Sequence, residues 1–398
     1  MQNVFSALFL LALIVGIMPP GIAAYPAAYA SMSIAAIGLV TLGWPERAAL
    51  RQPMALAILG AIVLLGATTP FVYRGEADLM APVLVLPMLT AIGLGMLGRR
   101  AKHVPEPVIF SIICLIAVVI AVIGGAYEAF VLQVGRVGLG NNPIHYGSLA
   151  AMVGGLTVIG IVATTSPWRY VFVAGPILGV AATALSGSRG PLAGALAMAG
   201  IAMLYLLIGE WRNRALRFSV LSALLAGAGL LLVLMSQGSA RVGGLLSAMD
   251  IFRFTGGSDD IRAALFASAL HALKSSPVYG LGFGQLMDTA RALYPEFVEV
   301  QSLENLHADW ANFAAMAGSM GLFAWILLLL APLTLLLDSR ARADRPLVLG
   351  TLVLVTGQAA LGVSNAMFGV LPQMVLYAVV LGYLFARARR LSDGATTS

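Results

Sequence analysis

Long runs of nonpolar residues, separated by short charged segments, recur along the whole chain. Many runs hold roughly 17 to 25 residues, the length that carries an α-helix across the hydrocarbon core of a bilayer. They lack the polar alternation of barrel strands, and backbone in lipid must satisfy its own hydrogen bonds, so the runs are predicted to be helices. The pattern therefore predicts an all-α polytopic membrane protein with about twelve transmembrane helices. They are expected near residues 3–19, 22–42, 54–73, 79–97, 107–127, 143–165, 169–186, 190–209, 218–236, 308–337, 346–364 and 370–386.

The positive charges predict which side of the membrane each loop faces. Lys and Arg collect in short cytoplasmic loops, and with a cytoplasmic N-terminus 15 of the 23 basic residues but only 6 of the 17 acidic ones fall on that side. Both termini are then cytoplasmic, and the net charge of +6 reflects topology. Because these arginines are spread over six membrane-flanking segments, nucleic-acid binding is a poor explanation of them. The first run has no preceding basic residue and is read as a retained helix rather than a signal peptide.

The chain is 60% hydrophobic and 10% charged, which predicts one integral membrane domain over residues 1–398. Its single cysteine, Cys114, excludes a disulfide within the chain. One long periplasmic segment, about residues 237–306, separates the ninth and tenth predicted helices. Ser258 with the two following aspartates is typical of a helix start. We expect short helices in this segment and a contribution to an active site.

Two polar clusters fall on the predicted periplasmic side. Arg189 lies in a Ser-Gly-Ser-Arg-Gly-Pro sequence whose tight turn and bidentate guanidinium suit phosphate oxygens, although an arginine placed at the membrane interface is the alternative. Arg136, Asn142 and Ser188 are candidate contacts to a phosphate or a sugar. The alternative for Asn142 is that it only shapes the turn before the next helix. His145 is expected to pack at that helix end.

His307 precedes the long nonpolar run 308–337 and is the candidate base, against the alternative of a structural histidine at a helix start. Arg262 and His271 are nine residues apart and are predicted on opposite helix faces, so His271 is excluded from the cluster. The glycine-rich stretch 280–284 follows no strand and predicts a mobile or tightly turned loop rather than a dinucleotide site. Gly318 and Gly321 are expected on one helix face.

Taken in order, these motifs resemble the O-antigen ligase and polymerase superfamily over about residues 130–325. The resemblance rests on four groups: Arg136 with Asn141-Asn142-Pro143, Ser186-Gly187-Ser188-Arg189-Gly190, Arg262 with Pro277 and Gly280-Leu281-Gly282-Phe283-Gly284, and His307 with Gly318 and Gly321. It implies a glycosyltransferase of the C type in the Gram-negative inner membrane, with its active site facing the periplasm. One departure is Ala308, where the family commonly has Asn, Ser or Gln, so a polar partner at that position is either not needed or has moved to Asn305 or Asp309.

The resemblance implies that a glycan on undecaprenyl pyrophosphate is transferred to a hydroxyl. In the ligase branch the acceptor is a sugar of lipid A-core in lipopolysaccharide, and in the polymerase branch it is another lipid-linked repeat unit. We favour the ligase because the long outer segment offers a platform for a bulky lipid acceptor. Arg189 and Arg262 would stabilise the leaving pyrophosphate, and His307 would be the general base.

A direct single displacement is expected to invert the anomeric centre. No metal or cofactor is expected, because the predicted outer face carries no close pair of carboxylates on a recognisable motif. Membrane lipids are expected partners and nucleic acid is not. A transporter of lipid-linked glycans is the less favoured alternative, since it predicts cations at mid-membrane and inverted repeats. A structural scaffold would not require polar residues confined to one side.

Overall fold

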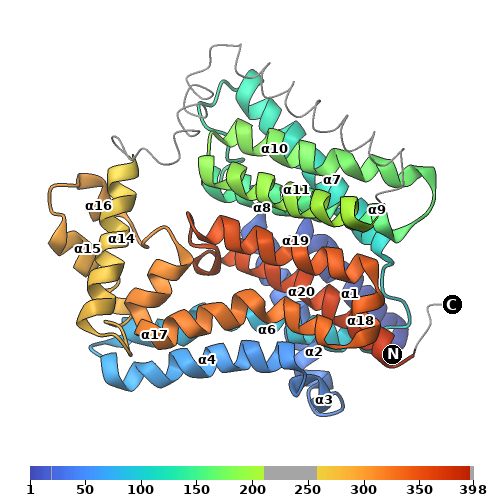
Figure 1. The fold of residues 1–398 in the computed structure, drawn as a ribbon, viewed down its shortest axis with the longest axis horizontal. Helices are drawn as coiled ribbons and strands as arrows, with labels where there is room; N and C mark the ends of the chain where they lie inside the picture. The colour runs from blue at the N-terminus through green and yellow to red at the C-terminus, as the bar shows by residue number, and fades with distance from the viewer. Residues whose placement is uncertain (19, 210–257, 395–398) are drawn as a thin grey trace.

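The computed structural model of the protein describes residues 1–18, 20–209 and 258–394. In this part of the chain, ten helices are long and nonpolar enough to cross a membrane, and α1 is a shorter apolar helix beside them. They run side by side as a bundle (Figure 1). The predicted all-α membrane fold is confirmed, and eleven of the predicted helices lie within several residues of their expected positions. The twelfth, 218–236, lies outside the described residues.

Most spans consist of one long helix, sometimes extended by a short one. The longer helices are α1 (Gln2–Ile17), α2 (Ala24–Leu42), α4 (Pro53–Val72), α6 (Leu89–Arg100), α7 (Pro107–Ala126), α8 (Pro143–Leu156), α10 (Ala174–Ser186), α11 (Arg189–Gly209), α14 (Ser258–Ser275), α17 (Asp309–Leu330), α19 (Arg345–Gly362) and α20 (Leu371–Ser392). The shorter elements are α3 (Arg47–Leu50), η1 (Glu76–Leu79), α5 (Met80–Leu84), η2 (Leu86–Met88), η3 (Tyr127–Val131), α9 (Ile159–Ala163), η4 (Pro167–Val173), η5 (Phe283–Gln285), α15 (Asp288–Leu293), α16 (Val298–Ser302), η6 (Ala331–Leu337), α18 (Ser339–Ala343) and η7 (Met367–Gly369).

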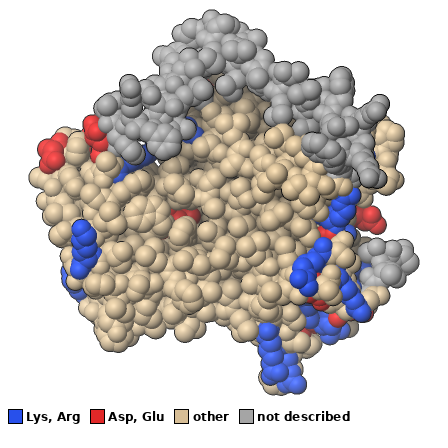
Figure 2. Space-filling model, in the orientation of Figure 1, with Lys and Arg blue, Asp and Glu red and all other residues tan. Residues whose placement is uncertain are grey.

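The two ends of the bundle differ in charge. At one end, here called the arginine-rich end, Arg99 pairs with Asp393 and Arg387 pairs with Asp344. Both ends of the described chain lie here, because Lys102 donates its N–H to Gln2 and Asp393 follows α20. In Figure 2 basic side chains gather at the ends of the molecule, and the wide band between them is almost free of charge. Of the basic segments that the sequence assigns to one side, those near residues 46, 99, 340 and 390 therefore meet at one end, and the segment 212–217 lies outside the described residues.

The opposite end, here called the site end, carries α14, α15 and α16 beyond the ends of α4 and α17 (Figure 1). These helices belong to the long segment 237–306, of which residues 258–306 are described. The rings of Phe266 on α14 and Trp310 on α17 lie 5.3 Å apart and hold the two helices together. The described part of the segment therefore has the short helices that the sequence predicts.

Helix α17 is broken at Ala317 and Gly318, where Gly318 has φ +59° and ψ −143°. A break inside a membrane-spanning helix leaves backbone groups without helical partners, which is costly in lipid. Residues 277–282 supply partners in four hydrogen bonds: Leu281 N–H to Ala315 O, Gly282 N–H to Met316 O, Ser319 N–H to Pro277 O and Met320 N–H to Val278 O. The glycine-rich stretch is thus a tight turn against the broken helix. The expectation that Gly318 and Gly321 share one helix face is wrong, because the break at Ala317 and Gly318 turns Gly318 toward Val278 and Gly280, whereas Gly321 lies against Phe313.

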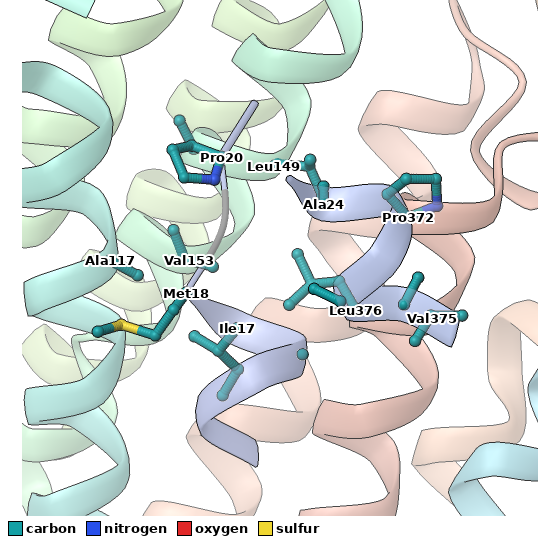
Figure 3. Close-up of a pocket in the computed structure, with 14 residues that line it drawn as sticks. Ile17, Met18, Pro20, Ala24, Ala117, Leu149, Val153, Pro372, Val375 and Leu376 are labelled. Carbon is teal, nitrogen blue, oxygen red and sulfur yellow. The ribbon is translucent and has the colours of Figure 1, made fainter. Parts of the chain in front are cut away.

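A small void lies among α1, α2, α7, α8 and α20 (Figure 3). Its volume of about 10 Å³ is close to the minimum for one water molecule, but the side chains around it, such as Ile17, Leu149 and Leu376, are nonpolar. A water there would lack side-chain hydrogen-bond partners, so we take the void as a packing defect and not as a place for a polar substrate.

Candidate active site

The turn between α10 and α11 places Arg189 at the site end. Helix α10 ends at Ser186, and Gly187 takes the left-handed conformation, with φ +61°, that a side chain disfavours. Ser188 follows and is buried, and Arg189 is the first residue of α11. The free amides at a helix start favour a negative charge there. Arg189 therefore lies where its guanidinium and the helix dipole both favour an anion.

Arg136 reaches this turn from the loop between α7 and α8. Its Nη2 donates to Ser188 Oγ at 3.1 Å, and its Nε donates to the carbonyl oxygen of Ser186 at 3.4 Å. The structure thus brings together Arg136, Ser188 and Arg189, three residues that the sequence predicts for the site. Arg136 therefore adds a second cationic residue at the turn that Arg189 follows.

Asn142 caps a helix in this structure. It precedes α8 and its Oδ1 accepts the N–H of Ile144 at 2.9 Å, which caps the helix. This contact matches the alternative interpretation, in which Asn142 shapes the turn. A contact between Asn142 and a substrate stays a prediction.

His307 has a backbone conformation that is unusual for a residue with a side chain, with φ +53°. Such a conformation costs roughly 1–3 kcal/mol and persists only where the surroundings hold it. Two amide side chains do so: Asn305 Oδ1 accepts the N–H of His307 at 2.9 Å, and Asn312 Oδ1 accepts the N–H of Leu306 at 2.8 Å. Asn305 therefore holds the backbone beside Ala308. The role of Asn312 was not predicted from the sequence.

Helix α14 presents Arg262 to His307. Leu265 and Ala269, three and seven residues further along, are fully buried on the same helical face, whereas His271 is exposed. The predicted separation of Arg262 from His271 is therefore confirmed. Burial and the nearby positive charge of Arg262 together lower the pKa of His307 below its ordinary value of 6.5. His307 is thus neutral at pH 7 and able to accept a proton.

His145, which the sequence assigns to helix-end packing, lies in the first turn of α8 near enough to His307 for the two rings to interact electrostatically. Its Nδ1 is buried and has no hydrogen-bond partner within the described ranges. The same helix packs closely on the α10–α11 turn, since a Cβ added at Gly147 would lie 2.8 Å from Ser186 Oγ. Helix α8 therefore links the turn of Arg189 to the neighbourhood of His307. In the sequence, the only sign of this link was that His145 lies close to the Asn141-Asn142-Pro143 turn.

The loop between α19 and α20 makes a second link that the sequence did not reveal. On one side it packs so tightly on the start of α11 that a Cβ added at Gly190 would collide with Ser364 Oγ. On the other side Asp309, which is 1% exposed, accepts the N–H of Phe368 at 2.9 Å through Oδ1. Asp309 therefore fixes the start of α17, two residues after His307, to the loop that contacts the helix of Arg189.

Residues 174–326, from α10 into α17, match the family described as O-antigen ligase. This segment of the chain is similar to that family. It holds Arg189, Arg262 and His307, whereas Arg136 and Asn142 precede it. No curated protein matches the chain. Within the part of the chain that the structure describes, three or more His, Cys, Asp and Glu side chains do not gather anywhere as a metal site.

Proposed function

We propose that this protein is an O-antigen ligase of the Gram-negative inner membrane. It would transfer a glycan from undecaprenyl pyrophosphate to a sugar hydroxyl of lipid A-core at the periplasmic face. The proposal joins the superfamily match to the chemistry of the site end. The observation that carries it is the half-buried His307, close enough to the cation Arg262 for its pKa to be lowered, at the same end as the Arg136–Ser188–Arg189 turn.

In the proposed reaction His307 removes the proton of the acceptor hydroxyl as its oxygen attacks the anomeric carbon of the glycan. The bond between that carbon and the pyrophosphate oxygen breaks, and the electron pair leaves with the lipid pyrophosphate. Arg262 and Arg189 stabilise the negative charge that develops there. One displacement inverts the anomeric centre, which NMR of the product can test.

The low pKa of His307 agrees with this role. Arg262 has two effects in the proposal: it binds the phosphate and it keeps His307 unprotonated. A base that is already neutral at pH 7 loses no activity to competing protonation. Arg136 and Ser188 would hold the donor at the turn, and Asn142 remains a candidate contact.

The ligase is favoured over the polymerase by the described part of segment 237–306. Its helices α14 to α16 project beyond the ends of α4 and α17 (Figure 1). A segment that projects past the bundle suits an acceptor with a bulky headgroup. A polymerase, joining two lipid-linked repeat units, is the alternative that the experiment below distinguishes.

The test is complementation of a deletion strain with wild type, His307→Ala or His271→Ala, followed by gel profiles of lipopolysaccharide and lipid-linked glycan. A ligase predicts that His307→Ala leaves the core uncapped while long glycan accumulates on undecaprenyl pyrophosphate. His271→Ala, an exposed histidine on the other face of α14, should behave as wild type. Core capped by one repeat unit would identify a polymerase. Normal lipopolysaccharide with well-folded His307→Ala would remove His307 from the mechanism.

Metal independence is proposed as part of the same mechanism. We expect the purified protein to transfer glycan in the presence of EDTA at the rate seen without it. Loss of transfer in EDTA, restored by a divalent ion, would overturn this part of the proposal.

A further inference from the structure

A second cavity lies at the arginine-rich end, far from the candidate active site. It has a volume of about 310 Å³, at the lower end of the range of about 300–1,000 Å³ that is usual for small-molecule sites. Four membrane-spanning segments reach it at their ends: Pro53 starts α4, Arg99 is next to the last residue of α6, and Leu337 and Ser392 end η6 and α20. The cavity therefore lies at the depth where hydrocarbon gives way to lipid headgroups.

The wall of this cavity has a nonpolar part and a charged part. The nonpolar part comprises Met54, Leu335 and Phe385, which are buried, and Leu337, which is 69% exposed at the rim. The charged part comprises Arg99, Arg389, Asp338 and Asp393. A ligand that matches both parts carries a polar headgroup and a hydrocarbon chain.

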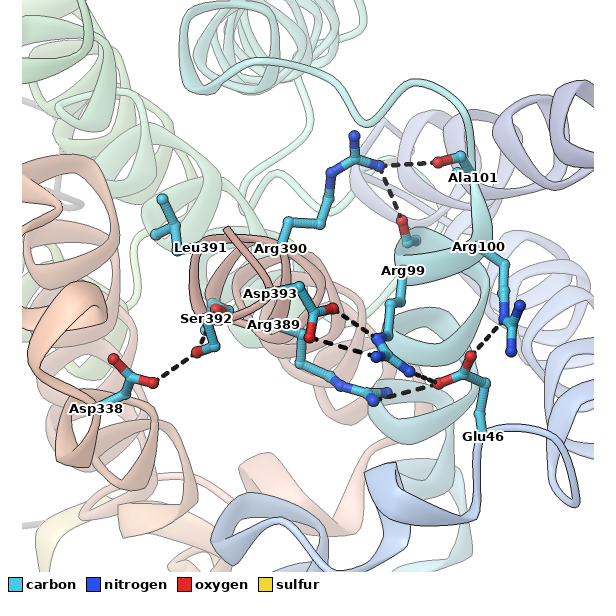
Figure 4. A network of polar contacts seen from close by, with 12 residues as sticks. Glu46, Arg99, Arg100, Ala101, Asp338, Arg389, Arg390, Leu391, Ser392 and Asp393 are labelled. Atoms are coloured by element: carbon cyan, nitrogen blue, oxygen red, sulfur yellow. Dashed lines mark hydrogen bonds and ion pairs between the residues drawn. The ribbon is translucent and has the colours of Figure 1, made fainter. Parts of the chain in front are cut away.

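A network of ions forms the base of the cavity (Figure 4). Arg99, Arg100 and Arg389 all bond to the carboxylate of Glu46, whose side chain is fully buried, and Arg99 also binds Asp393. Three cations thus face two carboxylates, which leaves one positive charge in excess. Burial opposes the charge of Glu46, but its bonds to the arginines outweigh this and lower its pKa. The carboxylate is therefore ionised at pH 7, and the network of three arginines and two carboxylates carries one net positive charge.

Arg389 is the cation that this network satisfies least. Its side chain is 8% exposed, stacks over the Phe385 ring and donates Nη2 to Glu46 at 3.2 Å. Its Nη1 is buried and has no hydrogen-bond partner in the described residues. A buried guanidinium nitrogen without a partner is costly, and a phosphate oxygen is the partner that such a group binds best.

Two carboxylates belong to the charged part of the wall, Asp393 beside Arg99 and Asp338 beside Ser392 (Figure 4). Asp338 accepts a bond from Ser392 Oγ at 2.6 Å, and Asp393 is 44% exposed. Their hydrogen bonds, from Ser392 to Asp338 and from Arg99 to Asp393, lower the pKa of each, so both are ionised. The four charged residues of the wall carry two positive and two negative charges, which complements a zwitterion better than an anion.

We propose that this cavity binds a membrane phospholipid whose headgroup carries a phosphate and a primary ammonium, the chemistry of phosphatidylethanolamine. The phosphate lies toward Arg389 and Arg99, the ammonium donates to Asp338 and Asp393, and an acyl chain follows Leu337 and Leu335. A primary ammonium donates three hydrogen bonds, whereas the quaternary ammonium of a choline headgroup donates none.

Binding is tested on the purified full chain in detergent, by native mass spectrometry and thermal shift. The probes are phosphatidylethanolamine, phosphatidylcholine and phosphatidylglycerol with the same acyl chains, and glycerophosphoethanolamine, which has none. We expect phosphatidylethanolamine to bind about tenfold more tightly than phosphatidylcholine, the ratio for one lost charge-assisted hydrogen bond. Equal binding of the three lipids would overturn the proposal, and full binding of the chainless compound would show a soluble ligand instead.

Variants separate the cavity from the surrounding charge. Asp338→Asn removes one carboxylate but keeps an oxygen to accept the N–H groups of Arg340 and Ala341, so α18 should still form. It should lose most of the preference for ethanolamine over choline. Arg51→Gln, an exposed arginine next to the cavity residue Gln52 but outside the lining, is the matched control and should retain it. An unchanged preference in Asp338→Asn would refute the site.

Discussion

The broken helix α17 offers the sharpest test of the fold, through the substitution Gly318→Ala. A Cβ at this position would lie 2.6 Å from both the carbonyl carbon and the oxygen of Val278, and 2.7 Å from the nitrogen of Gly280. All three are backbone atoms, so no side chain can rotate out of the way. Either α17 or the 277–282 segment has to move.

The cost has two parts. A residue with a side chain at φ +59° and ψ −143° is strained by about 1–3 kcal/mol. Separating the two backbones also weakens the hydrogen bonds from Ser319 to Pro277 and from Met320 to Val278, each worth about 0.5–1.5 kcal/mol. The sum is about 2–6 kcal/mol, which is large because folded proteins are stable by only about 5–15 kcal/mol.

The assay is the melting temperature of the purified protein in detergent, together with glycan transfer. Gly200→Ala on α11 is the control, because a Cβ added there meets nothing within 4 Å. We expect a clear fall in melting temperature and loss of transfer for Gly318→Ala, and neither for Gly200→Ala. If both variants melt like wild type, the break in α17 does not depend on glycine and the reasoning fails.

Three further predictions concern charge. Because Arg262 helps to lower the pKa of His307, the acid limb of the pH–rate profile should lie below pH 6.5. This limb should move to higher pH in Arg262→Gln, which removes the positive charge, but not in Arg262→Lys, which keeps it. A limb at the same pH in both variants would contradict the coupling. Glu46→Gln should destabilise the protein by about 3–5 kcal/mol, measured by unfolding, because it leaves the buried Arg389 without its carboxylate. Since the pKa of Glu46 is lowered, this stabilisation is present above the ordinary value of 4.5 and is lost as the pH falls through the folded-state pKa, so the gap to the variant should close in acid. Arg136→Ala should reduce transfer about tenfold or more by releasing Ser188, whereas an unaffected rate would show that the bond only supports the turn.

Much of the site could be located from the sequence but not assembled from it. Charge counting places Arg136, Arg189, Arg262 and His307 on one side, because the cost of moving a charge across the bilayer fixes which loops share a face. It does not say which of them are neighbours, since helices far apart in the chain can be packed in many orders. The proximity of His145 to His307, and the contact of the α19–α20 loop with Gly190, depend on that order.

The break at Gly318 shows the same limit inside one helix. The residues 308–337 read as a continuous nonpolar run, and nothing in that run predicts the interruption. The backbone partners that make the break tolerable come from residues 277–282, about forty positions earlier. Local pattern therefore gives the helix, and a distant segment decides its shape.

The sequence by itself determined the membrane-spanning helices of the described residues to within several residues, and it predicts which charged loops share a side. These follow from the transfer of nonpolar side chains, backbone groups and charges between water and lipid, which depends on each residue and its near neighbours. Only the tertiary structure decided the neutral state of His307 beside Arg262, the buried network around Glu46 and the cavity next to it. Burial, electrostatic coupling and cavity shape are properties of side chains from several helices at once, so they exist only after those helices have packed.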